Sequence, residues 1–243
     1  MKSSSGPAEH WSRPDRVLVI MAKAPRPGAV KTRLASSLPP NAVTAFYRCL
    51  LEDTLALGRS LDGVEVGVMC PDSDVGELTK LAGNEALVVA QKGEGLAAGL
   101  TSVFAHFAQE QRRRIIAFNS DSPHLPSFVL QSAFETLLTK DIVVGPTHDG
   151  GYYLVGAKAS HPTLFSGDGM STTSALERLL SRARALELSI GFADPFYDID
   201  LAEDLARLSG ELRLAPERAP RTARWLSRWE LTSSELGTST GEL

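Results

Sequence analysis

The segment formed by residues 23–34 concentrates positive charge directly after a short hydrophobic run. Its four cationic side chains are Lys23, Arg26, Lys31 and Arg33. Two prolines and Gly28 favour an open loop without a regular hydrogen-bond pattern. Lysine and arginine on such a loop suit a chain of phosphates, because they donate charged hydrogen bonds to its oxygens. The spacing matches neither a Walker loop nor a dinucleotide fingerprint, and a solvated basic loop is the alternative.

A second loop, residues 91–96, carries two glycines just before a helical pattern. Gly93 and Gly95 have no side chain, so the backbone there can approach a flat ligand closely. Gln91 offers both a donor and an acceptor for the edge of a base. A plain turn explains the two glycines about as well.

Asp121 follows the apolar run Ile-Ile-Ala-Phe, on a loop stiffened by Pro123. A carboxylate at the carboxyl end of a buried strand is a natural ligand for a hard cation such as Mg²⁺ or Mn²⁺. A turn or helix-capping role for Asp121 is the alternative. We expect His124, three residues later, to pack or cap rather than to bind a ligand.

Asp149 precedes two glycines, Gly150 and Gly151, and a hairpin turn is the simplest explanation of that pattern. Tyr152 and Tyr153 come next. They point to opposite faces if a strand follows, so at most one of them faces a ligand.

Asp198 and Asp200 lie two residues apart ahead of a helical pattern. They share one side of the chain if the segment is extended. Acidic residues before a helix are also ordinary capping residues, so this pair alone does not indicate a binding site.

The elements that must position these residues alternate between strand and helix. Nearly continuous apolar runs predict buried strands at residues 16–22, 64–70, 86–90, 114–118 and 141–145. Helical patterns lie at residues 41–59, 73–81, 96–111 and 127–138. The alternation predicts an α/β fold with a mostly parallel sheet between two layers of helices. Ligands bind such sheets at the carboxyl ends of the strands, here just after Ala22, Ala90, Phe118 and Gly145.

Beyond residue 145 we expect a strand at residues 152–157 and helices at residues 171–185 and 202–209. One domain over residues 16–210 is therefore predicted, after a flexible segment at residues 1–15. Residues 211–243 are predicted to be an appendage. Its first part, rich in arginine with Trp225 and Trp229, is expected to be helical, and residues 231–243 are expected to be mobile.

Composition restricts the classes of function. The chain has 243 residues and a formal net charge of −4, whereas proteins that coat nucleic acid carry a basic face. No apolar run reaches the roughly 18 residues of a membrane span, and the first fifteen residues lack the apolar stretch of a signal peptide. Cys49 and Cys70 show no metal or redox spacing and are expected to be reduced thiols. We therefore expect a cytoplasmic protein without a nucleic-acid partner.

Five motifs in order carry a resemblance that spans about residues 16–210. They read KAPRPGAVKTRL, QKGEG, NSDSPHLP, GPTHDGGYYLVGA and DIDLAEDL. The chain resembles a bacterial family once called a domain of unknown function and described as nucleotide-diphospho-sugar transferase-like or glycosyltransferase-like. The resemblance implies the glycosyltransferase A fold, a Rossmann-like fold shared with molybdenum-cofactor and phospholactate guanylyltransferases.

The resemblance also implies roles for individual residues. Nucleotide contacts would come from Lys23, Ala24, Pro25, Gly28, Lys31, Arg33, Gln91, Gly93, Gly95 and Ser120. Acceptor contacts would come from Asp149, Gly150, Gly151, Tyr152, Ser171 and Thr172. Asp121 and Asp200 would bind Mg²⁺ or Mn²⁺. The partners implied are a nucleotide and a small-molecule acceptor, and a homodimer is an assembly that the sequence leaves open.

Two departures from the family concern substrate choice. The glycine loop continues as Gly-Leu-Ala-Ala-Gly-Leu, closer to the guanylyltransferases than to other relatives. Gly169 and Met170 precede Ser171 and Thr172, where relatives tend to have a tryptophan.

Three functions follow as hypotheses. In nucleotidyl transfer, an acceptor attacks the α-phosphate of a nucleoside triphosphate while Lys31 and Arg33 hold the developing charge. The Asp-Ser-Pro form of the Asp121 loop favours this reaction, because glycosyltransferases of this fold more often carry two acids there. In glycosyl transfer from a nucleoside diphosphate sugar, Asp149 would be the general base of an inverting enzyme. A catalytically silent nucleotide-binding domain is the third, since fold alone does not establish activity.

Overall fold

The computed structural model describes residues 14–166 and 174–238, with side chains described as far as Leu231. Its strands are β1 (Arg16–Met21), β2 (Val64–Cys70), β3 (Leu87–Ala90), β4 (Arg114–Asn119), β5 (Ile142–Pro146), β6 (Tyr152–Ala157) and β7 (Ile190–Phe192). Its helices are α1 (Pro40–Arg59), α2 (Val75–Ala82), α3 (Gly95–Gln109), α4 (Ser127–Thr139), α5 (Ala175–Ala185), α6 (Ala202–Leu214) and α7 (Pro220–Thr238). The predicted α/β alternation is confirmed.

Within the described residues, the strands form one sheet of seven in the order β3-β2-β1-β4-β6-β5-β7. β6 runs antiparallel to its neighbours β4 and β5, and the other pairs are parallel. In the central pairs Ile20 lies opposite Val68 on one side and Phe118 on the other. The predicted mostly parallel sheet is therefore confirmed, and the loops after β1, β2, β3 and β4 meet at one edge.

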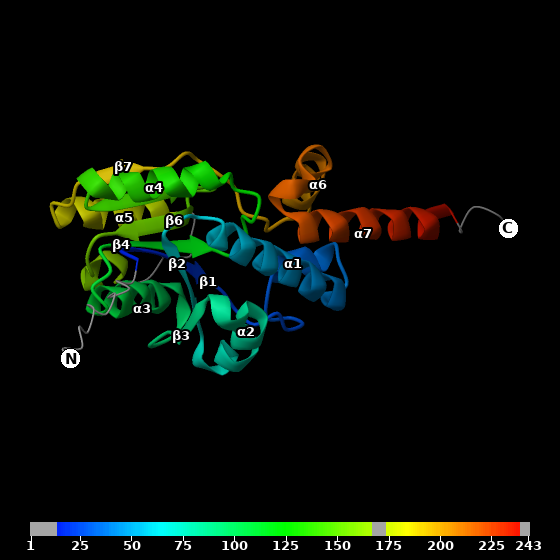
Figure 1. Cartoon of the computed structure of the whole chain (residues 1–243). Helices are drawn as coiled ribbons and strands as arrows, with labels where there is room; N and C mark the ends of the chain where they lie inside the picture. Colours follow the sequence, from blue (N-terminus) through cyan, green and yellow to red (C-terminus); the bar gives the residue numbers. More distant parts are fainter. Residues whose placement is uncertain (1–13, 167–173, 239–243) are drawn as a thin grey trace, which may run out of the picture.

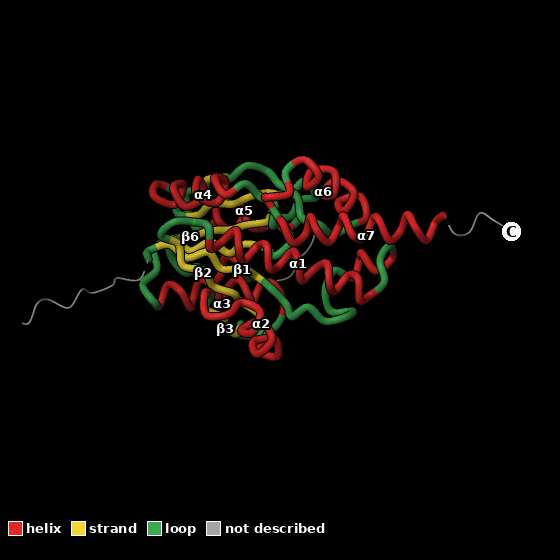
Figure 2. The backbone as a smooth tube through the Cα atoms, turned by 45° about the vertical axis from the view of Figure 1, so that its right-hand side comes forward, coloured by secondary structure: helices red, strands yellow, loops and turns green. Residues whose placement is uncertain are grey.

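Helices cover both faces of the sheet (Figure 1). Alternate residues of each central strand pack on opposite layers. Val17 and Val19 of β1 join a core that includes Phe104 of α3 and Leu179 of α5. Leu18 of β1 joins the core under α4, and Ile20 joins the core under α1 and α2. Burial on both faces explains why these strands are continuous apolar runs, and Figure 2 shows the strands enclosed between helices.

A further apolar core lies beside the sheet, where α6 and α7 pack against α1 (Figure 1). It includes Leu34 and Phe46 from the first part of the chain and Leu212 and Leu226 from the last part. The expected boundary at residue 210 falls inside α6, which ends at Leu214 and buries Leu212 in this core. α7 continues as helix to Thr238, through much of the stretch that was expected to be mobile.

β7 was not predicted from the sequence. It has three residues and lies at the edge of the sheet beside β5, with Phe192 exposed. A strand this short at an edge carries little apolar pattern. No helix of the described residues is both long and apolar enough to cross a bilayer.

Candidate functional site

The loops at the carboxyl ends of the strands enclose a cleft of about 970 Å³. Lys23, Lys31 and Arg33 line it after β1, Pro71 and Ser73 after β2, Gln91 and Gly95 after β3, and Ser120 and Asp121 after β4. Asp200 reaches the same cleft from the segment before α6. The prediction from the strand ends is thus right for the loops after β1, β3 and β4, but the loop after β5 does not line this cleft and the loop after β2, which was not expected, does.

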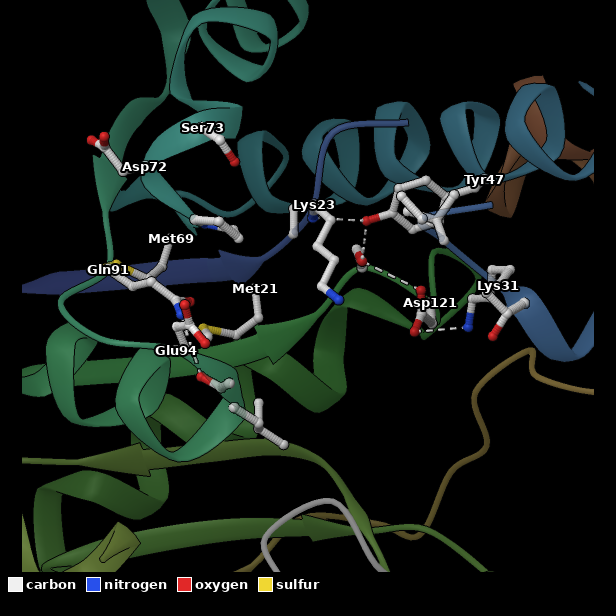
Figure 3. Close-up of a pocket in the computed structure, with 18 of the residues that line it drawn as sticks. Met21, Lys23, Lys31, Tyr47, Met69, Asp72, Ser73, Gln91, Glu94 and Asp121 are labelled. Atoms are coloured by element: carbon white, nitrogen blue, oxygen red, sulfur yellow. Dashed lines mark hydrogen bonds and ion pairs between the residues drawn. The ribbon is translucent and has the colours of Figure 1, made fainter. Parts of the chain in front are cut away.

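Lys31 lies between the two carboxylates that were predicted to bind metal. Its ammonium nitrogen is 2.8 Å from Asp121 Oδ2 and 2.8 Å from Asp200 Oδ1. The side chain is only 4% exposed, and Figure 3 shows its contact with Asp121. Burial by itself would lower the pKa of Lys31, but the two carboxylates outweigh burial and raise this pKa. The ammonium therefore stays charged and neutralises part of the acidic cluster.

The backbone at Lys31 is in the left-handed conformation, with φ 47° and ψ 42°. This conformation is costly for a residue other than glycine and needs support from its surroundings. A short 3₁₀ helix, Thr32–Ser36, follows it, and its Leu34 is fully buried in the core shared with α6 and α7. The position of Lys31 is therefore fixed by its ion pairs on one side and by the Leu34 anchor on the other.

Asp198 is a third carboxylate at this place, and it was not among the predicted metal ligands. One oxygen from each of Asp121, Asp198 and Asp200 lies within 4.8 Å of the others. Tyr197 and Ile199 are buried while Asp198 and Asp200 are partly exposed, as expected for an extended segment with one face on the core. Burial raises the pKa of Asp198 to about 6, and Asp200 adds to this rise while Lys31 opposes it. The two-residue spacing was the signal that could have identified it.

The donor set fits a hard divalent cation. Three carboxylates that can converge are the oxygen ligands that Mg²⁺ and Mn²⁺ prefer. Asp121 and Asp200 come from loops 79 positions apart in the sequence, yet both contact Lys31. A cation bound at this place would therefore share Asp121 and Asp200 with the ammonium of Lys31.

Tyr47 of α1 supports the Asp121 loop and was not among the residues predicted for the site. Its hydroxyl accepts a 3.2 Å hydrogen bond from Lys23 N and lies 3.1 Å from Ser120 Oγ. Ser120 Oγ in turn donates to Asp121 Oδ1 at 3.3 Å, and Figure 3 shows this chain of contacts. Burial, together with the charge of Asp121, raises the pKa of Tyr47 to about 12. Its residue type within a long helix gave no signal of this role.

The four cations of the first loop have different roles. Lys23 is exposed and its side chain extends into the cleft (Figure 3). Arg33, with a side chain 66% exposed, lies 3.3 Å from Asp200 Oδ2. Arg26 instead pairs with Asp74 and Glu77 beside α2 and does not line the cleft. The expectation that all four cations face one ligand is thus wrong for Arg26. Its side chain is held instead by Glu77 in α2 and by Asp74, which directly precedes α2.

The remaining predicted nucleotide contacts of this loop lie beside the cleft. Ala24 is buried, and its N–H donates to Asp74 Oδ2 at 2.8 Å. Pro25 and Gly28 do not line the cleft. These three residues shape the loop, and the side chains that line the cleft come from its two ends.

The glycine loop forms the end of the cleft opposite Asp121 (Figure 3). Gly93 and Gly95 have positive φ values of 84° and 80°, which explains the two glycines. Gln91 Nε2 donates to Gly93 O at 2.9 Å, so its donor is used within the loop. A Cβ on Gly99 of α3 would lie 2.8 Å from Gln91 Oε1, so this glycine gives Gln91 its room.

Three of the predicted acceptor residues, Asp149, Gly150 and Gly151, form the turn between β5 and β6 and do not line the main cleft. Asp149 accepts hydrogen bonds from Thr147 Oγ1 and, at 3.1 Å, from Gly151 N. The Thr147 bond is the largest cause of a lowered pKa for Asp149, and Arg33 contributes to the same shift. The charge of Arg33, which pairs with Asp200, therefore also acts on Asp149.

Other residues of the acceptor prediction have separate positions. Gly150 O accepts a hydrogen bond from Leu176 N at the start of α5. Tyr152 is half-buried against the α3 and α5 layer, whereas Tyr153 is buried on the other face and bonds to Asp194 O. Ser171 and Thr172 lie outside the described residues. His124 is fully buried between Phe196 and Tyr197, so its expected packing role is confirmed.

Comparison with known families gives a match over half of the chain. Residues 51–172 match the model of a family described as "Uncharacterized protein conserved in bacteria (DUF2064)". No curated protein matches the chain.

Solved structures share the fold. A protein from Desulfovibrio desulfuricans described as a candidate nucleotide-diphospho-sugar transferase has 24% identity and a TM-score of 0.83, with 90% of this chain and 96% of that chain covered. The 4-diphosphocytidyl-2C-methyl-D-erythritol synthase of Anaerococcus prevotii has 12% identity and a TM-score of 0.55, with 82% and 97% covered. A CMP:2-keto-3-deoxy-manno-octonic acid synthetase complexed with CTP has 11% identity and a TM-score of 0.56, with 82% and 99% covered. These likenesses establish the fold predicted from the resemblance.

Proposed function

The chain belongs to the family described as uncharacterized proteins conserved in bacteria (DUF2064), and from the geometry of its cleft we propose that it is a metal-dependent nucleotidyltransferase. The reaction moves a nucleotidyl group from a nucleoside triphosphate to a phosphorylated small-molecule acceptor and releases pyrophosphate. Two of the solved structures that share the fold are named as synthases or synthetases of cytidyl compounds, and one of them holds CTP. Their names support this class of reaction for the present chain.

The observation that carries the proposal is the meeting of Lys31 with Asp121 and Asp200 at one wall of a cleft that Lys23 and Arg33 also line. Triphosphates carry several negative charges, and bond breaking at phosphorus places further charge on the leaving pyrophosphate. Preorganised cations at that point stabilise the transition state more than the ground state. A cleft of about 970 Å³ has room for a nucleotide and an acceptor together.

Each group has a defined task in this reaction. Lys23 and Arg33 bind the phosphate oxygens, and Lys31 lies where the α-phosphate would approach the acidic cluster. An oxygen of the acceptor phosphate forms the new bond to the α-phosphorus as the bond to the pyrophosphate oxygen breaks. Asp121, Asp198 and Asp200 would hold Mg²⁺ or Mn²⁺, which when bound neutralises phosphate charge.

Glycosyl transfer from a nucleoside diphosphate sugar is the second candidate. The similarity to the candidate nucleotide-diphospho-sugar transferase favours it. Asp149 would then serve as the base of an inverting enzyme, but the hydrogen bond from Thr147 lowers its pKa and weakens its basicity. Nucleotidyl transfer requires no such base from this turn.

The test measures both reactions in parallel. The protein is incubated with Mg²⁺ or Mn²⁺, each nucleoside triphosphate and a panel of phosphorylated acceptors, and pyrophosphate release is followed; a second series follows hydrolysis of nucleotide sugars. We expect acceptor-dependent pyrophosphate release without sugar-donor turnover. Turnover of sugar donors alone would establish glycosyl transfer instead.

A pair of variants separates an enzyme from a silent nucleotide-binding domain. Asp121→Asn should abolish metal-dependent nucleotide binding and turnover, because it removes a charge of the acidic cluster. Glu203→Gln changes an exposed acid in the first turn of α6 and should leave both unchanged. Nucleotide binding that is equal in all three proteins, with no turnover of any donor, would indicate the silent domain.

A further inference from the structure

The contacts of Lys31 give it a second task beyond contact with a nucleotide. Its ammonium is 2.8 Å from one oxygen of Asp121 and 2.8 Å from one oxygen of Asp200, and its side chain is almost fully buried. Asp121 and Asp200 are also two of the three carboxylates that can converge on a cation. The same two acids therefore serve two positive charges.

A cation bound by these two acids would lie close to the ammonium of Lys31. A cation held about 2.1 Å from the same two oxygens would lie no more than about 5 Å from an ammonium at hydrogen-bond distance from them. Two cations at that separation repel each other strongly in a partly buried site. Either the ammonium leaves or the cation binds weakly.

We propose that Lys31 is an internal counter-ion that competes with the divalent cation for Asp121 and Asp200, so that cation binding releases its ammonium to the nucleotide phosphates. The inference rests on the proposed function, because the phosphates supply the new partners of the ammonium. Without them, Lys31 would leave two ion pairs and gain none. Through Lys31, binding of the cation makes the nucleotide bind more tightly, and binding of the nucleotide makes the cation bind more tightly by the same factor.

Lys23 is the matched comparison within the same cleft. It carries the same charge and lines the same cavity, but no described residue forms an ion pair with its ammonium. A general effect of positive charge on cation affinity would appear on removal of either lysine. Direct competition would appear only on removal of Lys31.

The first experiment measures Mn²⁺ affinity by electron paramagnetic resonance, without nucleotide, for the unaltered chain, Lys31→Met and Lys23→Met. We expect Lys31→Met to bind Mn²⁺ at least about tenfold more tightly and Lys23→Met to change affinity by less than about threefold, since only Lys31 contacts the acids. Equal affinities in all three proteins, equal gains in both variants, or no Mn²⁺ binding at all would overturn the inference.

The second experiment uses the unaltered chain and so does not depend on the folding of a variant. Surface amines are modified briefly with an acylating reagent, with and without saturating Mn²⁺, and modification is counted by mass spectrometry. Mn²⁺ should raise modification of Lys31 at least about threefold relative to Lys23, because an ammonium released from two carboxylates leaves its buried position and becomes accessible to the reagent. Unchanged modification of Lys31 at saturation would overturn the inference.

The outcomes also separate this inference from the proposed function. A chain that releases pyrophosphate from a nucleoside triphosphate but shows no competition at Lys31 retains the function and loses the inference. A chain that shows the competition but transfers no nucleotidyl group retains the inference for Lys31 and the cation, and loses the proposed reaction.

Discussion

The hydroxyl of Ser122 donates a 2.9 Å hydrogen bond to the main-chain carbonyl of Tyr197. This contact joins the loop that carries Asp121 to the segment that carries Asp198 and Asp200, although the two bonded residues are 75 positions apart in the chain. Ser122 is fully buried and also accepts a 3.2 Å hydrogen bond from Asn119 Nδ2. The distance between the acidic groups thus depends on a serine that carries no charge.

We expect Ser122→Ala to weaken Mn²⁺ binding while leaving the protein folded. The variant leaves the buried Tyr197 carbonyl without its partner, which costs about 1–3 kcal/mol of unfolding free energy. Mn²⁺ affinity by electron paramagnetic resonance and urea unfolding measure the two effects. Loss of stability with unchanged Mn²⁺ affinity would contradict the role in positioning the acids.

Ser209→Ala is the matched control for this change. Ser209 is also buried, and its hydroxyl donates to Glu230 between α6 and α7. Removal of this hydroxyl should lower the unfolding free energy by a similar amount, because a hydrogen bond between α6 and α7 is lost. Mn²⁺ affinity should not change, since Ser209 does not contact the acidic loops.

The sequence predicted the sheet because its strands are buried on both faces. The run from Val17 to Ile20 is fully buried, and burial of that kind produces a continuous apolar pattern that is easy to recognise. β7 gave no such pattern, since an edge strand of three residues needs no apolar face. A helix was expected in the region of α7, but the residues against which it packs could not be predicted, because Leu34 lies about 190 positions earlier and such pairing leaves no local signal.

The site was predicted only where chemistry is local. Asp121 is visible as an acid at a strand end, and its meeting with Asp200 followed from the resemblance. That Lys31 lies between the two acids could not be foreseen, because it depends on a left-handed backbone and on distant packing. The prediction that Arg26 faces the ligand was wrong for the same reason, since its acidic partners Asp74 and Glu77 lie about 50 positions away.

Tyr47→Phe should impair the reaction without unfolding the protein. The change removes only the hydroxyl that accepts from Lys23 N and contacts Ser120. Loss of this support should lower kcat/KM for pyrophosphate release by about tenfold, which corresponds to about 1.4 kcal/mol. The ring stays in its buried place, so the unfolding free energy should fall by no more than about 1.5 kcal/mol.

Tyr153→Phe provides the comparison for Tyr47→Phe. Tyr153 is also buried, and its hydroxyl donates to Asp194 O at 2.8 Å, away from the cleft. We expect a similar change in stability and no change in kcat/KM. Equal kinetic losses in the two variants would show that the Tyr47 contact has no specific role.

Asp53→Ala should release α7 from α1. The Asp53 carboxylate is buried and accepts 2.8 Å hydrogen bonds from Thr222 N and Thr222 Oγ1 in the first turn of α7. These bonds satisfy a helix end and replace the water that a buried carboxylate has lost, so their loss should cost about 2–4 kcal/mol. Thermal unfolding measures the change. Because α7 and Leu34 share one core, Mn²⁺ affinity should also fall.

Glu52→Gln is the control for Asp53→Ala on the same helix. Its carboxylate forms a 3.3 Å ion pair with Arg221, whose side chain is half-exposed. Ion pairs of this kind contribute about 0–1 kcal/mol, so stability should change little. A large loss of stability in Glu52→Gln would show that the ion pair with Arg221, and not the buried Asp53 contact, holds α7 on α1.

His124 should make the unfolding free energy depend on pH below neutrality. Burial, with Arg218 and Arg207 nearby, lowers the pKa of His124 to about 3, while Glu211 Oε2 lies 3.7 Å from Nε2. In the unfolded chain His124 becomes protonated near pH 6.5, whereas in the folded chain it becomes protonated only near pH 3. The contribution of His124 to the unfolding free energy is therefore complete above pH 6.5, and below pH 6.5 it falls by up to about 1.4 kcal/mol per pH unit. Urea unfolding at pH 7.5, 6 and 5 should show this fall reduced in His124→Phe and retained in His148→Gln, an exposed histidine; equal slopes in all three proteins would exclude His124 as the cause.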